Sequence, residues 1–421
     1  MKITVPHNKK TISTGKALIM YFVVSLFLFF EMAVQVSPSV MSTQLMQALN
    51  IGTLGLGFMS GGYFYTYTLM QIPSGILLDR FNPRYVIVIS VLICALGCLL
   101  LGLANSFILA SLARLFMGFG SAFAFVSVLV VTADLFSVKQ FATMTGITQM
   151  LAALGAMSGQ LPIHFIVDSI GWRRTMFLFA IIGLLIALGI YYILRYERKE
   201  VDVTHKDPFS HFIHNLKRIV TNRQTWLLAL YACLGWAPMS GFTSLWGVSF
   251  LIKVDQLSPG TAAFLCSLMW IGLAIASPLL GYVSTRFHNR KLPLVLSALI
   301  GVIAFSLLLF FKLSPVYLAI LLFLAGSACS GQALSFTLVK ENNTADVAAS
   351  AIAFNNMAVV ISGAIFQPFI GWLLKEFHFL SLLRYRYALL VVLLAYAVAF
   401  ILALFFIKDT LKYRANQAVR G

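Results

Sequence analysis

Charged residues are scarce in this chain of 421 residues: Asp, Glu, Lys and Arg make up only 10%, while hydrophobic residues make up 60%. Soluble domains carry about 25% charged residues. The scarcity therefore excludes a water-soluble protein of this length. Acidic residues are the scarcer kind, with 13 against 30 basic residues and a net charge of +17. Because the basic residues are scattered between apolar runs, we interpret them as signals of membrane topology and expect no nucleic-acid partner.

Cysteine is also rare, and the motifs of several enzyme classes are missing. The five cysteines all lie inside apolar runs, without a C-x-x-C spacing (Cys94, Cys98, Cys233, Cys266 and Cys329). We expect buried thiols rather than disulfides or a metal site. No Walker A sequence is present, so ATP is not an evident energy source. We therefore expect no catalytic residue, no metal and no cofactor, in a protein that is not an enzyme.

Long apolar runs occupy most of the chain. Each of twelve candidate spans reaches the ~20 residues needed to cross ~30 Å of hydrocarbon. They lie near 17–40, 53–78, 85–104, 106–133, 141–163, 175–194, 225–252, 260–284, 292–311, 315–339, 347–374 and 385–407. The pattern predicts an all-α polytopic membrane protein with twelve transmembrane helices.

Lysine and arginine are distributed unevenly between the two sides of these spans. With the N-terminus inside, only seven fall outside (Arg173, Arg174, Lys253, Lys312, Lys375, Arg384 and Arg386). This bias predicts that both termini are cytoplasmic, in a bacterial inner membrane. The basic stretch 1–16 precedes an apolar run that is too long for a signal-peptide core. We expect that stretch to remain as a cytoplasmic tail.

The chain also contains an internal repeat. At an offset of 206 or 207 residues, five positions of the first half meet similar residues in the second: Gly75 and Gly281, Arg80 and Arg286, Asp134 and Glu341, Gln149 and Asn356, Gln160 and Gln367. The longest polar stretch, 195–224, lies between these halves. We predict two pseudo-symmetric six-helix bundles, 17–194 and 225–407, joined by a cytoplasmic linker at 195–224 and followed by a tail at 408–421.

Several short motifs carry a resemblance to a known family. Gly75, Asp79, Arg80 and Arg84 form a G-x-x-x-D-R-x-x-x-R loop, and later segments read Arg114-Leu-Phe-Met-Gly-Phe-Gly and Gly171-Trp-Arg-Arg-Thr-Met-Phe. Together they resemble the major facilitator superfamily, with a weaker likeness to its lysosomal dipeptide carriers. The resemblance implies two bundles around a central cavity that opens alternately to each side. Asn82 departs from it, because many members have glycine there.

We expect the loop after Gly75 to form a gate on the cytoplasmic side. Gly75 lies one helical turn before Asp79, where its missing side chain lets a neighbouring helix come close. In this hypothesis Asp79 pairs with Arg84, and Asp134 holds Arg80 or Arg84. The alternative is a short turn whose arginines serve only the topology.

The second copy of this loop is expected to contribute less to the gate. It retains Arg286 but has Thr285 in place of Asp79, so it lacks the acidic partner.

One acid and one base lie deep in the predicted spans. Glu31 is mid-span in the first helix and Arg114 lies inside the fourth. A charge at this depth costs roughly 2.5–3.5 kcal/mol on insertion scales, so each group needs a partner, water or, for the acid, a proton. The hypothesis is a proton-responsive ion pair, and similar residues occur in proton-coupled sugar carriers of the resembled family. The alternatives are a static pair, or an Arg114 that bonds backbone carbonyls only.

Neutral polar and aromatic residues at similar depth are the candidates for binding a solute. They are Gln35, Tyr63, Tyr67, Gln149, Gln160, Trp236, Trp270, Gln332, Asn355 and Asn356. Gln149 and Gln160 are three turns apart and so should share a face. Packing for the aromatics and interhelical hydrogen bonds for the amides are the alternative roles.

These observations favour a secondary transporter of a small polar solute, with proton-coupled symport as the expected mechanism. Amino acids, short peptides and sugars fit, and a monoanion is possible through Arg114. The expected partners are the solute, protons and membrane lipid, and we expect a monomer. Proton-driven efflux of amphipathic compounds is the alternative, although span 5 matches the glycine-proline pattern of antiporters only in part. A membrane sensor without transport is a third interpretation.

Overall fold

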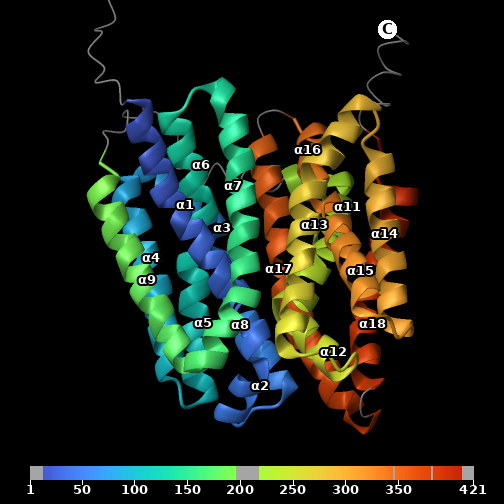
Figure 1. The fold of residues 1–421 in the computed structure, drawn as a ribbon. Coiled ribbons are helices and arrows are strands. Elements are labelled where there is room, and N and C mark those ends of the chain that lie inside the picture. The colour runs from blue at the N-terminus through green and yellow to red at the C-terminus, as the bar shows by residue number, and fades with distance from the viewer. Residues whose placement is uncertain (1–12, 196–217, 345–346, 381–382, 410–421) are drawn as a thin grey trace, which may run out of the picture.

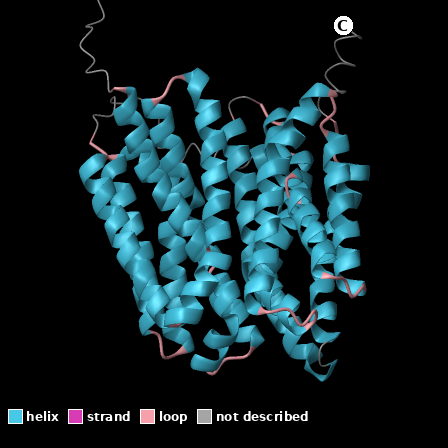
Figure 2. Cartoon of the chain, in the orientation of Figure 1, coloured by secondary structure: helices cyan, strands magenta, loops and turns pink. Residues whose placement is uncertain are grey.

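The computed structural model describes residues 13–195, 218–344, 347–380 and 383–409. Every regular element in these ranges is a helix (Figure 2). The helices run side by side between two ends of the molecule (Figure 1). We call them the upper end, where the turns at 81–82 and 287–290 lie, and the lower end, where the turns at 49–52, 104–106 and 254–258 lie.

The first half crosses the molecule six times. Its helices are α1 (Thr14–Val36), α2 (Pro38–Ala48), α3 (Thr53–Arg80), α4 (Pro83–Leu103), α5 (Phe107–Ser121), α6 (Ala124–Leu135), α7 (Val138–Ser158), α8 (Leu161–Ile170) and α9 (Trp172–Ile193). The pairs α5–α6 and α7–α8 each form one crossing, and α2 is a short helix at the lower end (Figure 1).

The second half also makes six crossings. Its elements are α11 (Arg223–Ala237), the π-helix η1 (Pro238–Trp246), α12 (Gly247–Lys253), α13 (Pro259–Arg286), α14 (Lys291–Phe310), α15 (Pro315–Ala328), α16 (Gly331–Asn342), α17 (Ala348–Glu376), the 3₁₀-helix η2 (Phe377–Leu380), α18 (Leu383–Ile401) and the π-helix η3 (Leu402–Phe406). The segments α11–η1–α12, α15–α16 and α18–η3 are single crossings.

The predicted twelve-helix, all-α membrane fold is confirmed. Among the described residues, ten segments are long and apolar enough to cross a membrane. The other two crossings are α3, which is rich in glycine, threonine and tyrosine, and α11–η1–α12, which the π-helix interrupts. Most of the expected linker 195–224 and of the tails 1–16 and 408–421 lies outside the described residues, so those boundaries stay predictions.

Local sequence signals place the helix starts. Asn82 and Ser258 accept hydrogen bonds from backbone amides of the first turn, and Pro83 and Pro259 follow them. A polar N-cap followed by proline suits a helix start, because the first amides have no partner within the helix. The spans are therefore separated by turns of only a few residues, which holds successive helices antiparallel.

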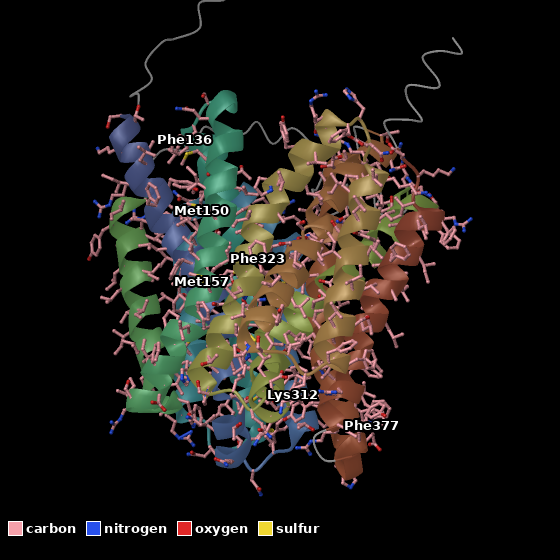
Figure 3. All side chains as sticks on the ribbon, turned by 45° about the vertical axis from the view of Figure 1, so that its right-hand side comes forward. Phe136, Met150, Met157, Lys312, Phe323 and Phe377 are labelled. Atoms are coloured by element: carbon pink, nitrogen blue, oxygen red, sulfur yellow. The ribbon has the colours of Figure 1, made fainter. Side chains whose placement is uncertain are left out.

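The two halves pack against each other mainly toward the lower end. The contact is closest between α3 and α17, where Thr53 Oγ1 donates to the carbonyl of Gly371 at 2.9 Å. A Cβ on Gly57 would lie 2.6 Å from the carbonyl oxygen of Gln367. Ser42 and Ser249 share a further hydrogen bond of 2.9 Å between the halves. The ribbons of α7 and α13 approach each other toward the lower end and diverge toward the upper end (Figures 1 and 3).

Gly75 does not have the close helix neighbour that its sequence position suggested. No atom lies within 4 Å of where its Cβ would be, whereas Gly57 and Gly61 of the same helix touch the backbone or ring of Pro368. The expectation was wrong for this conformation, because α3 and α17 meet closely through the lower part of α3 and not at its upper end.

We expect Gly57→Val to prevent closure of the lower end. The valine side chain would meet backbone atoms of Gln367 and Pro368, which cannot move aside as a side chain can. An overpacking cost of roughly 1–3 kcal/mol would shift the closed-to-open equilibrium about 5- to 150-fold. The measurement is the rate at which a thiol reagent modifies Ser249→Cys, since Ser249 is buried in the closed interface.

Gly189→Val is the matched control. Gly189 lies in α9, where the Cβ would make only an ordinary contact of 3.9 Å with Val23. Equal labelling rates in the two variants would show that Gly57 does not limit closure.

Candidate functional site

The acidic centre of the site is Glu31, in the middle of α1. Its side chain is fully buried. Tyr63 of α3 donates a hydrogen bond of 2.6 Å from its hydroxyl to Glu31 Oε2. The second carboxyl oxygen, Oε1, has no hydrogen-bond partner among the described residues. An apolar span thus contains a carboxyl group of which one oxygen accepts a hydrogen bond from Tyr63 and the other has no hydrogen-bond partner among the described residues.

Arg114 of α5 is equally buried and lies on the other side of Tyr63. Its guanidinium carbon is 4.7 Å from the centre of the Tyr63 ring. Arg114 also donates to the backbone carbonyls of Val34 and Ser60, each at 3.4 Å. Arginine suits this position because its planar cation can stack on an aromatic ring while its N–H groups bind carbonyls.

The expected direct ion pair between Glu31 and Arg114 is therefore absent from the described residues. Tyr63 connects the two instead, with its hydroxyl on the acid and its ring under the base. The spacing in sequence could not show this, because the link depends on a third helix. We name Glu31, Tyr63 and Arg114 the buried charge cluster.

A polar ladder continues from the cluster along α3. The rings of Tyr63 and Tyr67 are 5.7 Å apart at an interplanar angle of 30°. One turn further, Gln71 accepts a hydrogen bond from Asn356 of α17, in the other half of the molecule. Sequence reasoning missed Gln71, although its spacing of four from Tyr67 places both on one helix face.

The second half contributes an aromatic pair and a buried amide. Trp236 and Trp270 pack edge to face with ring centres 6.2 Å apart. The indole N–H of Trp270 has no partner among the described residues. Asn355 donates to Ser335 at 2.8 Å, which ties α17 to α16. Asn355 therefore holds two helices of one half together, as the interhelical alternative proposed.

Two further amides among the candidates for binding a solute, Gln35 of α1 and Gln332 of α16, are both buried.

Gln149 and Gln160 differ in exposure and in local backbone. Gln149 is exposed on α7, whereas Gln160 is fully buried in the break between α7 and α8. Gln160 has non-helical φ and ψ angles of −105° and −93°, so a count of three regular helical turns does not apply across the break. Gln160 instead donates to the carbonyl of Thr243 in η1 at 2.9 Å, and its repeat partner Gln367 donates to Ser240 of η1 at 2.8 Å.

These two glutamines hold the same π-helix from opposite halves. A π-helical turn is rare and marks a local departure from the α-helical hydrogen-bond pattern. Gln160 therefore belongs to the contact between the halves at the lower end, rather than to an open binding surface. If the halves separate there, Gln160 loses its hydrogen bond to the Thr243 carbonyl.

At the upper end of the first half, the structure gives side-chain positions for Arg80, Arg84 and Asp134 but not for Asp79. Arg80 and Asp134 are exposed, and Arg84 stacks on Tyr191, with 4.1 Å from the guanidinium carbon to the ring centre. The side chain of Asp79 is outside the described part of the structure. The proposed pairing of Asp79 and Asp134 with these arginines stays a prediction.

In the second half, the ion pair of the corresponding loop is formed by Arg290. Arg286 is exposed, while Arg290 forms a salt bridge of 3.0 Å with Glu341. Arg290 also donates to the hydroxyls of Ser284 and Thr285. This loop therefore has an ion pair although it lacks the acid at position 285, because Glu341 reaches it from the end of α16.

Comparisons with known proteins agree with this architecture. The family model described as Major Facilitator Superfamily matches residues 20–255 and 239–421. A probable galactarate/D-glucarate transporter of Escherichia coli is 23% identical over 420 residues, covering 89% of this chain and 91% of the relative. A probable sulfoacetate transporter of Cupriavidus necator is 24% identical over 276 residues, covering 61% of this chain and 62% of the relative. The chain thus matches less than two thirds of that second relative.

A solved structure is similar over nearly the whole chain. A bacterial homolog of the human lysosomal transporter Spinster, in an inward-facing and unoccupied conformation, superposes with a TM-score of 0.78. It is 18% identical and covers 93% of this chain and 97% of its own. At this identity the likeness establishes the fold.

We expect Tyr63→Phe to destabilise the protein by about 1–3 kcal/mol, because the Glu31 carboxyl loses its donor while buried. The phenyl ring stays beneath Arg114, so the change isolates the hydroxyl. The measurement is thermal unfolding of the purified protein in detergent. Tyr65→Phe, in the same helix at a partly exposed ring, is the control. If both variants unfold at the same temperature, the bond to Glu31 does not stabilise the fold.

Proposed function

The chain belongs to the Major Facilitator Superfamily, and on this premise we propose that it is a secondary transporter which moves a small polar solute by alternating access. The finer proposal is proton-coupled symport, with Glu31 as the proton-carrying group. The observation that carries it is the buried charge cluster, which combines a titratable acid, a tyrosine and an arginine at the centre of one half.

Support for proton coupling comes from the way the cluster spans three helices. Glu31 is on α1, Tyr63 on α3 and Arg114 on α5, and α3 also forms the main contact with the other half. Gaining a proton would remove the negative charge that faces the Tyr63 hydroxyl and change how Tyr63 sits between acid and base. Because Tyr67 and Gln71 continue along α3 to Asn356, that change would reach the interface between the halves.

A small organic anion is the substrate class that we favour. Arg114 supplies a buried positive charge, and its Nε has no partner among the described residues. The indole N–H of Trp270 is a second buried donor without a partner there. The relatives named as probable galactarate/D-glucarate and sulfoacetate transporters carry the names of small organic acids, which supports an anion as substrate, although each of these acids has two acidic groups rather than one. Amino acids, peptides and sugars stay open, as does the likeness to dipeptide carriers.

We further propose that the upper end faces the cytoplasm and that the lower end faces outward. The support is the excess of lysine and arginine at the upper-end turns, which include Arg80, Arg84, Arg286 and Arg290. The conformation described, with its halves joined toward the lower end, would then be closed to the outside. Solute would leave or enter from the cytoplasmic side in this state.

Glu31→Gln should abolish uphill accumulation of solute while preserving exchange at equal concentrations. Glutamine resembles the protonated acid and can still accept from Tyr63, so both conformations should remain accessible. The measurement is uptake into proteoliposomes with and without an imposed pH gradient, with radiolabelled D-glucarate and sulfoacetate as the first solutes.

Asp168→Asn is the control for this experiment, because it removes an exposed acid near the lower end without touching the cluster. If Glu31→Gln still concentrates solute against a gradient, Glu31 is structural and the coupling proposal fails. If neither protein shows exchange with any solute, the transport proposal itself loses its support.

Membrane orientation is testable with two positions in matching turns. Gln256 at the lower end and His288 at the upper end are both exposed, with positive φ angles of 57° and 48°. The native cysteines are all buried and give a low background. An impermeant thiol reagent added to intact cells should label Gln256→Cys and spare His288→Cys until the cells are permeabilised. The opposite pattern would invert the orientation.

A further inference from the structure

A cavity of about 470 Å³ lies at the lower end, between the two halves. The first half lines it from α2 and α3, through residues that include Thr43 and Thr53. The second half lines it with four basic residues, Lys253, Lys375, His378 and Arg384. Among the described residues that line it there is no Asp or Glu. We name it the basic vestibule, and its volume is within the range of small-molecule sites, which is about 300–1,000 Å³.

The lysines and the arginine of the vestibule are not neutralised by neighbouring acids. No salt bridge of Lys253, Lys375 or Arg384 is present among the described residues. Asp255 is close in sequence to Lys253, but the charges that act on it come from Arg386 and Lys312. Burial raises the pKa of Asp255 to about 6, against the opposing effect of those two cations. Lys312 and Phe377, the residue before His378, both lie at the lower end (Figure 3).

The positive charge is at the end of the molecule where the topology rule predicts little of it. Of the seven lysines and arginines that the sequence assigns to the outer side, five are in the second half (Lys253, Lys312, Lys375, Arg384 and Arg386). Outer loops are usually poor in such residues. The topology rule therefore does not explain this cluster.

The vestibule also lies against the contact that closes the lower end. Thr53 lines the cavity and donates to Gly371 across the interface. Lys375 follows Gly371 by one helical turn on α17 and lines the same cavity. A solute held here would be in place to enter when Thr53 and Gly371 separate.

We propose that the basic vestibule captures the oxyanion of a small organic acid, a carboxylate or sulfonate, before the lower end opens. This inference rests on the proposed function for its link to transport and for the outward orientation. A phosphate of an anionic lipid headgroup has the same charge chemistry, and the experiment separates the two sources. Clefts lined by one sign of charge raise the local concentration of the opposite ion and the rate of its encounter by roughly 10- to 1,000-fold.

The first experiment measures the attraction without requiring transport. Thr43→Cys places a thiol in the vestibule of the purified protein, in nanodiscs of phosphatidylcholine only. Its reaction rate with a sulfonate-bearing methanethiosulfonate is compared with that of a trimethylammonium-bearing one. We expect Lys253→Gln with Lys375→Gln to lower the ratio of the anionic to the cationic rate about tenfold. The effect should shrink as salt rises from 0.01 M to 0.1 M, where the screening length falls from about 30 Å to about 10 Å.

Two controls isolate the vestibule from the general charge of the surface. Arg174→Gln removes one exposed cation from the lower end of the first half, outside the cavity, and should leave the ratio unchanged. Ser169→Cys reports an exposed position on α8 and should not respond to the double lysine change. If the ratio at Thr43→Cys is the same with and without the two lysines, the vestibule does not attract anions and the inference is overturned.

Competition distinguishes a soluble acid from a lipid. Acetate or methanesulfonate should slow modification of Thr43→Cys by the sulfonate-bearing reagent, while choline at the same concentration should not. If only nanodiscs that contain phosphatidylglycerol slow the reaction, and the soluble acids do not, the site holds lipid and solute capture is wrong.

Transport kinetics measured separately for solute added at the lower end and at the upper end then test whether the vestibule acts in transport. The double lysine variant should raise the apparent KM about tenfold for solute added at the lower end, with unchanged maximal rate and unchanged KM from the upper end. An unchanged KM on both sides, despite the altered thiol ratio, would overturn the role in capture but leave the transporter proposal standing. If the protein without substitutions shows no solute exchange, the proposed function is contradicted instead.

Discussion

The constraint on which this structure depends is the burial of an acid and a base in a chain that crosses a membrane. Glu31 and Arg114 are both inaccessible, and each costs free energy unless polar groups surround it. Tyr63 contacts both groups: its hydroxyl donates a hydrogen bond to the Glu31 carboxyl, and its ring packs against the Arg114 guanidinium. Three helices of the first half are thereby fixed relative to one another. The alternating access proposed above requires each half to move as a unit.

Closure of the lower end depends on backbone contacts more than on side chains. Gly57 and Gly61 bring α3 onto Pro368 of α17, and Gln160 and Gln367 bind carbonyls of the same π-helix. Small residues and interhelical hydrogen bonds are the usual means of joining helices in a membrane, where apolar burial gives little preference for one partner over another. The basic vestibule lies beside this interface and is lined by basic residues of the second half.

The sequence predicted some residues correctly because their role depends on local pattern. The apolar runs predicted the crossings, and the repeat of Gln160 at Gln367 predicted two related halves whose glutamines do make parallel contacts. It failed where a role depends on which helix lies opposite. Gly75 has an open surface in this conformation, and the second loop, which was expected to lack an acidic partner, has one in Glu341 of α16. Both errors came from aligning positions along the chain without knowing the partner helix.

Hydrophobicity and charge distribution by themselves determined the class of protein, the number of crossings and the candidate buried charges, because the cost of polar groups in hydrocarbon acts on every residue separately. Only the tertiary structure decided that Tyr63 contacts both Glu31 and Arg114, and that Gln160 lies in a break of the fifth crossing and donates to Thr243 of the other half. It also decided that basic residues from α12, α17, η2 and α18 line one cavity. Such arrangements depend on how separate helices pack, and no local pattern in the chain encodes that packing.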